Sequence, residues 1–188
     1  MFKDLILKNR SYRRFHEDES VSAETLKELV ELARLSPSGS NKQSLKFYLS
    51  AGAKNEEIFS CLGWAGYLTE WPGPEKGERP AAYILILNDK SIAEGPQINA
   101  GIAATGILLG AAEKGLGGCM LGNVNRKKLA ELLAFPENLE IVLALALGKP
   151  KETVVLEEVK PDGDIKYWRD ETGVHHVPKR KIEDIIVG

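Results

Sequence analysis

Two uninterrupted apolar runs constrain the fold of this chain more than any other feature. Ala81–Leu87 and Ile141–Leu147 are apolar at every position, so both faces of each run must be covered by other parts of the chain. Runs of this length match buried strands at the centre of a sheet. The segment between them, Ile98–Lys114, is rich in Ala and Gly and predicts a helix that another helix can approach closely.

The remaining elements favour an α+β fold over a doubly wound Rossmann sheet, because helices outnumber strands and do not alternate strictly with them. Ser22 is expected to cap a helix over residues 23–35, and Asn125 a helix over Lys127–Ala134. The other predicted elements are a short opening helix, a strand over Leu45–Ser50, a short helix near 54–62, and a hairpin-like pair at Ile165–Arg169 and Val174–Val177. A chain of 188 residues suits one domain, 1–188.

Composition argues against several classes of partner. Twenty-five basic and 27 acidic residues leave a net charge of −2, so no broad surface favours nucleic acid or an anionic membrane. No apolar run approaches the roughly 20 residues of a membrane helix, and the N-terminus lacks a signal-peptide pattern. We therefore expect no membrane association and a cytoplasmic location.

Neither the cysteines nor the histidines predict a metal site. Cys61 and Cys119 stand far apart without Cys-x-x-Cys spacing, so buried, unreactive thiols are expected. His16 is isolated, and the adjacent pair His175 and His176 would point to opposite faces of a strand.

Two basic clusters near the ends of the chain are candidates for holding a phosphate. Arg10-Ser11-Tyr12-Arg13 offers two planar guanidinium groups and a hydroxyl, and Pro178-Lys179-Arg180-Lys181 adds charge near the other end. One phosphate held between both would explain two clusters in a chain of balanced charge. Each cluster alone also suits an ordinary solvated surface, and a nucleic-acid or phosphopeptide patch over Arg10–Arg14 has little support from the charge balance.

Two loops are suited to a flat ligand. The Ser36–Gln43 loop is dense in hydroxyl and amide groups that can satisfy a heterocycle, and Gly39 would let its backbone approach closely. An ordinary helix-to-strand connection is the alternative, but it does not explain so many amide and hydroxyl groups in one loop. The Gly115–Asn123 turn follows a predicted helix, so it is not a Rossmann fingerprint, but its backbone can also approach a ligand edge.

These pieces together resemble the nitroreductase superfamily over nearly the whole chain. The similarity lies in the order of five motifs, which are Arg10-Ser11-x-Arg13-x-Phe15, Ser36-Pro37-Ser38-Gly39-Ser40-Asn41-x-Gln43, Gly115-Leu116-Gly117-Gly118-Cys119-Met120-Leu121-Gly122, Ala146-Leu147-Gly148-Lys149-Pro150 and Lys179-Arg180-Lys181. The resemblance implies a nitroreductase-like fold with a central, mainly antiparallel sheet flanked by helices. It also implies a homodimer joined through long helices, with an FMN in each of two interface sites.

The resemblance assigns the cofactor contacts by position. Arg10, Ser11 and Arg13 would hold the ribityl phosphate, with Arg180 and Lys179 closing on it. Pro37, Ser38 and Gly39 would lie against the isoalloxazine, and Asn41 and Gln43 would contact its edge or come from the partner subunit. Backbone N–H groups near Leu121, Gly122 and Asn123 would face its N5 and O4 region. Two departures are the Ser44-Leu45 pair, where the family usually has Pro-Trp, and a short chain, which implies that an extended lid is missing.

The implied reaction passes electrons from NAD(P)H through FMN to a nitroaromatic, a quinone or a similar flat acceptor by ping-pong chemistry. No side chain must act as a catalyst, because the flavin carries the chemistry. Within the irregular stretch Trp64–Arg79, Trp64, Tyr67 and Trp71 are candidates for stacking on the acceptor, although core packing is the commoner fate of such residues. Alternatives are another FMN reaction of the superfamily, such as dehydrogenation or reductive dehalogenation, and a flavin-binding module without catalysis. The sequence does not distinguish the physiological acceptor, NADH from NADPH, or one- from two-electron reduction.

Overall fold

The computed structural model describes all residues, 1–188, and its main sheet is built on the two apolar runs. β3 (Ala82–Asp89) lies between β2 (Leu45–Ser50) and β5 (Leu139–Pro150), and β5 also pairs with β4 (Gly117–Leu121) and with the short β1 (Phe15–His16). Every pair in this sheet is antiparallel. The predicted α+β fold with a central antiparallel sheet is confirmed.

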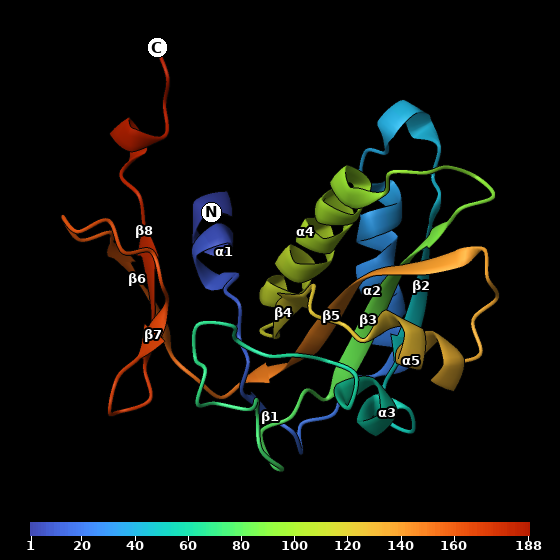
Figure 1. Cartoon of the computed structure of the whole chain (residues 1–188), viewed down its shortest axis with the longest axis horizontal. Helices are drawn as coiled ribbons and strands as arrows, with labels where there is room; N and C mark the ends of the chain where they lie inside the picture. Colours follow the sequence, from blue (N-terminus) through green and yellow to red (C-terminus); the bar gives the residue numbers. More distant parts are fainter.

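Helices cover both faces of the main sheet (Figure 1). On one face, α2 (Ala23–Leu35) and α4 (Gln97–Glu113) pack together over Ile84 and Ile86 of β3. On the other face, α3 (Asn55–Phe59) and α5 (Arg126–Leu132) cover Tyr83 and Leu85 of the same strand. Because successive strand residues point to opposite faces, the apolar run Ala82–Leu87 of β3 supplies both cores.

The predicted helix caps are present. The Ser22 hydroxyl accepts a hydrogen bond from the Thr25 N–H at 3.0 Å, and the Asn125 side chain accepts one from the Lys128 N–H at 3.2 Å. Each bond satisfies an N–H that has no partner inside its helix, which sets where α2 and α5 begin. The predicted boundaries of α2 are met, while α5 ends at Leu132 rather than at Ala134.

A close approach at Gly118 brings α4 against β4. A Cβ added to Gly118 would lie 2.6 Å from the Ala146 carbonyl oxygen on β5 and 2.6 Å from Leu108 Cδ2 on α4. Only glycine leaves room for both neighbours. The Gly-rich turn of the sequence thus serves packing at this position.

Residues 151–188, here called the C-terminal module, form a second sheet of three short strands. β8 (His175–Lys179) pairs in parallel with β6 (Val154–Glu158) and antiparallel with β7 (Trp168–Arg169), and a 3-10 turn, η2 (Ile182–Asp184), follows. Figure 1 shows this sheet at the opposite side of the molecule from β2, next to α1 (Phe2–Lys8). The expected antiparallel pair is present, although its first strand is shorter than predicted and β6 was not predicted. The longest helix, α4 with 17 residues, falls short of what a membrane crossing requires, and so do the others.

Candidate functional site

A cavity of about 340 Å³ lies where the two ends of the chain meet. Its walls come from the segment after α1, from α4 and β4, and from the C-terminal module. The lining residues are Asn9, Arg10, Ser11, Arg13, Leu108, Met120, Val154, Tyr167, His175, Val177 and Lys179.

The cavity gathers cationic side chains from distant parts of the sequence. Arg10 and Arg13 enter from the N-terminal segment, and Lys179 enters from β8. No carboxylate lines the cavity. Such a surface attracts an anion, because its positive charges are not neutralised locally. Arg180 is exposed and does not line the cavity.

Arg13 is the most enclosed of these cations, with 8% of its surface exposed. Its Nη1 donates to the Ser11 carbonyl oxygen at 3.2 Å and to His175 Nε2 at 3.1 Å, and its guanidinium carbon lies 4.7 Å from the centre of the Tyr167 ring. Burial, followed by the charge of Arg13, lowers the pKa of His175 to about 4. His175 is therefore neutral near pH 7 and accepts the hydrogen bond from Arg13.

Donors in this cavity lack acceptors. Arg10 Nε and Arg13 Nε are buried and have no hydrogen-bond partner. A buried guanidinium N–H without an acceptor is costly, and a phosphate oxygen would satisfy it with a charge-assisted bond. The residues present therefore fit a phosphate group such as that of FMN.

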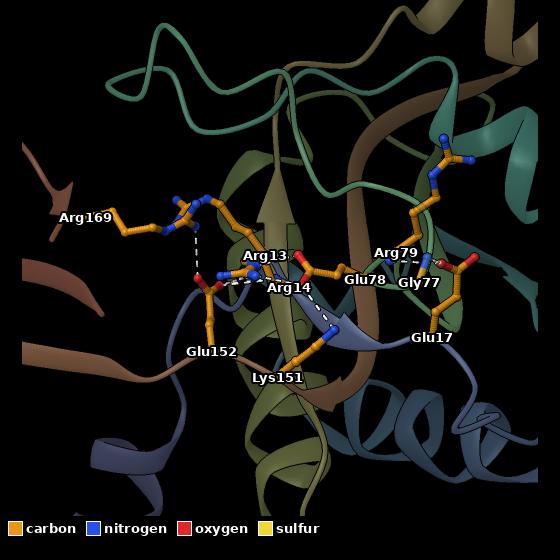
Figure 2. Close-up of polar contacts among 9 residues, drawn as sticks. All are labelled: Arg13, Arg14, Glu17, Gly77, Glu78, Arg79, Lys151, Glu152 and Arg169. Carbon is orange, nitrogen blue, oxygen red and sulfur yellow. Dashed lines mark hydrogen bonds and ion pairs between the residues drawn. The ribbon is translucent and has the colours of Figure 1, made fainter. Parts of the chain in front are cut away.

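Two buried carboxylates bind groups at and next to Arg13 (Figure 2). Glu152, whose side chain is fully buried, accepts hydrogen bonds from the backbone N–H groups of Arg13 and Arg14 and, at 3.0 Å, from Arg169 Nη2. Both carboxylate oxygens of Glu78 accept hydrogen bonds from the Arg14 guanidinium, and Lys151 pairs with the same carboxylate. These contacts, first those with Arg14, lower the pKa of Glu78 to about 2. Arg14 therefore belongs to a structural ion pair, although the sequence places it in the same basic cluster as Arg13.

The Ser36–Gln43 loop lines a different cavity of about 390 Å³ between α2, β2 and α4. Asn99 Oδ1 of α4 accepts a hydrogen bond from the Gly39 N–H at 2.9 Å, and Ser38 Oγ accepts one from the Gln43 N–H at 3.1 Å. Of the predicted contacts, Pro37, Ser38, Asn41 and Gln43 line this cavity. Within one chain the loop and the Arg13 cavity are thus separate sites.

The predicted turn residues line neither cavity. Leu121 is buried in the core beneath α3 and α5, and Gly122 is exposed, with its carbonyl oxygen bound by Arg126 Nη2 at 3.1 Å. The Asn123 carbonyl oxygen accepts a hydrogen bond from the Gly63 N–H at 2.8 Å. Only their neighbour Met120 reaches the Arg13 cavity.

The three aromatic candidates have different surroundings. Trp64 packs at the edge of the core, with its ring centre 5.8 Å from that of Phe59. Trp71 lies 4.6 Å from the Arg169 guanidinium. Tyr67 is half exposed, and its ring centre lies 4.9 Å from that of Tyr167, which lines the cavity.

Sequence reasoning overlooked His175 and Tyr167. A signal for His175 was present, since residues i, i+2 and i+4 of a strand share one face. His175, Val177 and Lys179 follow this spacing in β8, and all three line the cavity. His176 faces the other way, with its ring nitrogens 3.2 Å from Glu157 and from Asp170, which confirms the expected opposite directions.

Comparisons with known proteins agree with this architecture. The family model described as the Nitroreductase family matches residues 6–149. A protein of Archaeoglobus fulgidus, whose name gives it as an NADH dehydrogenase/NAD(P)H nitroreductase, is 27% identical over 79% of this chain and 84% of its own length.

Solved structures share the fold. A nitroreductase family protein of Streptococcus pneumoniae TIGR4 matches with a TM-score of 0.73 and 17% identity over 100% of both chains. An FMN-dependent nitroreductase of Clostridium difficile R20291 matches with a TM-score of 0.63 and 24% identity over 78% of this chain and 86% of its own. With a family match that extends over most of the chain, we conclude that it belongs to the Nitroreductase family.

Proposed function

We propose that this protein is an FMN-dependent oxidoreductase that passes electrons from NAD(P)H to an oxidised organic acceptor. The observation that carries the proposal is the cavity at the meeting point of the chain ends, where Arg10, Arg13 and Lys179 face a space without carboxylates and two guanidinium N–H groups lack acceptors. Family membership supports an oxidoreductase, and the names of related proteins include FMN and NAD(P)H.

In this proposal the chain binds and orients the cofactor. Arg13 and Arg10 donate to the ribityl phosphate, Ser11 adds a hydroxyl, and Lys179 adds a mobile charge from the other side. Leu108 and Met120 offer an apolar wall beyond the phosphate. When bound, FMN would supply the hydride and electron transfer between NAD(P)H and the acceptor, so no nucleophile or general base of the protein would be required.

A second copy of the chain completes the site in this proposal. The Ser36–Gln43 loop lines a separate cavity of its own chain, so its contacts with the flavin ring would reach the cofactor held by the partner. Pro37, Ser38 and Gly39 would lie against the ring, and Asn41 and Gln43 would bind its edge. The backbone of Leu121, Gly122 and Asn123 stays a proposed contact for the N5 end.

We further propose a nitroaromatic or quinone acceptor and a cytoplasmic setting. Tyr67 is the best placed of the aromatic candidates, because its ring is half exposed and touches the cavity wall through Tyr167. Trp64 and Trp71 are engaged with Phe59 and Arg169, and we rank them below Tyr67 as acceptor contacts.

Arg13→Ala tests the phosphate site. We expect FMN affinity to fall by about 10- to 100-fold, the effect of losing hydrogen bonds from a charged group, while the far-ultraviolet circular dichroism is unchanged. The quenching of flavin fluorescence during titration measures the affinity. As a control, Lys3→Ala removes one positive charge from an exposed position on α1 and should leave the FMN affinity unchanged. Unaltered FMN affinity in Arg13→Ala removes Arg13 from the pocket, and a protein that takes up no FMN at all contradicts the proposed function.

A further inference from the structure

His175 is buried in the wall of the Arg13 cavity and leaves one ring nitrogen unused. The residue is 1% exposed, and its Nε2 lies 3.1 Å from Arg13 Nη1. A guanidinium only donates hydrogen bonds, so His175 Nε2 must be the acceptor, and in a neutral ring the proton then sits on Nδ1. His175 Nδ1 is buried and has no hydrogen-bond partner.

The unused Nδ1–H is one of three such donors in this cavity. The other two are Arg10 Nε and Arg13 Nε, and all three belong to residues that line the same space. Buried N–H groups are almost always paired in folded proteins, so three unpaired donors around a space without carboxylates call for acceptor oxygens from a ligand.

The surroundings keep His175 neutral and its ring in place. The Tyr167 ring centre lies 5.2 Å from that of His175, and the Arg13 guanidinium lies over the same tyrosine. Removal of the ring from water and the adjacent positive charges of Arg13 and Arg169 oppose protonation, and they lower its pKa to about 4. The bond from Arg13 to Nε2 selects the tautomer that presents a donor at Nδ1.

We propose that His175 is an uncharged ligand of the bound phosphate, donating from Nδ1–H while its Nε2 holds Arg13 in position. The proposal rests on the proposed function, because the phosphate is that of FMN. It adds a second phosphate contact from the C-terminal module, beside Lys179, outside the residues that the family model matches. His175 supplies hydrogen-bond direction without adding charge, whereas Arg10, Arg13 and Lys179 supply the charge.

The binding of FMN compared with riboflavin, which lacks the phosphate, separates this role from a merely structural one. We expect His175→Phe, which keeps a ring but has no donor or acceptor, to weaken FMN binding by about 10- to 100-fold and to leave riboflavin binding unchanged. His175→Gln, whose amide can accept from Arg13 and donate to the phosphate, should recover part of the loss. His176→Phe is the matched control, because His176 points to Glu157 and Asp170 on the other face of β8.

Different results would contradict the role of His175 and the proposed binding of FMN. If His175→Phe binds FMN as tightly as the unaltered protein, or loses FMN and riboflavin equally, the inference is overturned. If the unaltered protein binds riboflavin as tightly as FMN, the phosphate site itself is wrong.

A spectroscopic measurement on the unaltered protein avoids any folding defect of the variants. In protein labelled with ¹⁵N-histidine, the nitrogen shifts should identify the Nδ1–H tautomer of His175, and its Nδ1 resonance should move when inorganic phosphate is added. An Nε2–H tautomer, or an Nδ1 resonance that FMN and phosphate both leave in place, overturns the inference.

Discussion

Burial keeps His175 neutral, and the stability of the folded protein therefore depends on pH through this residue. In the folded chain its pKa is lowered from 6.5 to about 4, mainly because the ring is removed from water. As the pH falls from about 6.5 to about 4, the unfolded chain takes up a proton at this position before the folded chain does. The stability that depends on a neutral His175 is therefore present above pH 6.5 and is lost towards pH 4.

Urea unfolding at several pH values between 7 and 4, without phosphate in the buffer, measures this contribution. We expect the unfolding free energy to fall over this range by up to roughly 3 kcal/mol more in the unaltered protein than in His175→Gln, since about 2.5 pKa units separate the two states. Parallel pH profiles for the two proteins would show that His175 is not the group responsible.

At the scale of residues, sequence reasoning succeeds where the cause is local. Ser22 and Asn125 cap their helices as expected, because a cap needs only its own side chain and an N–H three residues away. It fails for Arg14, whose guanidinium pairs with a carboxylate, whereas the guanidinium of Arg13 meets His175. That partner, Glu78, is 64 residues away in the chain, and nothing in the local sequence identifies it.

At the scale of elements, glycines set how closely β4 and α4 pack. Gly118 has no space for a Cβ between the Ala146 carbonyl and Leu108, whereas a Cβ on Gly101 in the second turn of α4 would meet nothing within 4 Å. An added methyl group would therefore clash with its neighbours at Gly118 and fit without contact at Gly101.

Gly118→Ala and Gly101→Ala therefore form a matched pair. We expect Gly118→Ala to lower the unfolding free energy by about 1–3 kcal/mol through overpacking, and Gly101→Ala to raise it by roughly 0.5–1 kcal/mol, the gain from replacing an interior helical glycine. Thermal and urea unfolding of both variants provide the test. A neutral Gly118→Ala would mean that β4 can shift away from α4 at little cost.

The strands of the main sheet could be predicted from the sequence, whereas those of the C-terminal module could be predicted only in part. Ala82–Leu87 of β3 and Ile141–Leu147 of β5 are apolar at every position, so their place in the sheet follows from burial alone. β6 alternates weakly and pairs in parallel with β8, from which it is separated by β7 and two turns. A parallel pairing over such a distance is set by tertiary contacts, among them the bonds of Glu152 to Arg13, Arg14 and Arg169.

At the scale of the whole molecule, one chain presents two separate cavities, which the proposed function treats as two half-sites. The cavity around Arg13 and the cavity around Ser38 are separate, so a flavin that uses both requires a second copy. Mixed dimers of two defective chains test this directly.

Arg13→Ala damages one half-site, and Ser38→Tyr fills the other. Each variant alone should bind little FMN, but a mixed dimer would contain one site built from the two undamaged halves. We expect co-expression of differently tagged chains, followed by two-step purification, to recover up to one FMN per mixed dimer. Mixed dimers without flavin would indicate that each chain builds its site alone.

The meeting of Arg10 and Lys179 in one cavity has a consequence for biosynthesis. These residues are 169 positions apart, so the ribosome makes the first half of the anion pocket long before the second. Until β8 has emerged and folded against the earlier chain, the arginines face open solvent and the pocket has no far wall. Under the proposed function, cofactor capture would therefore follow the synthesis of β8, and a chain stalled before β8 should retain no FMN.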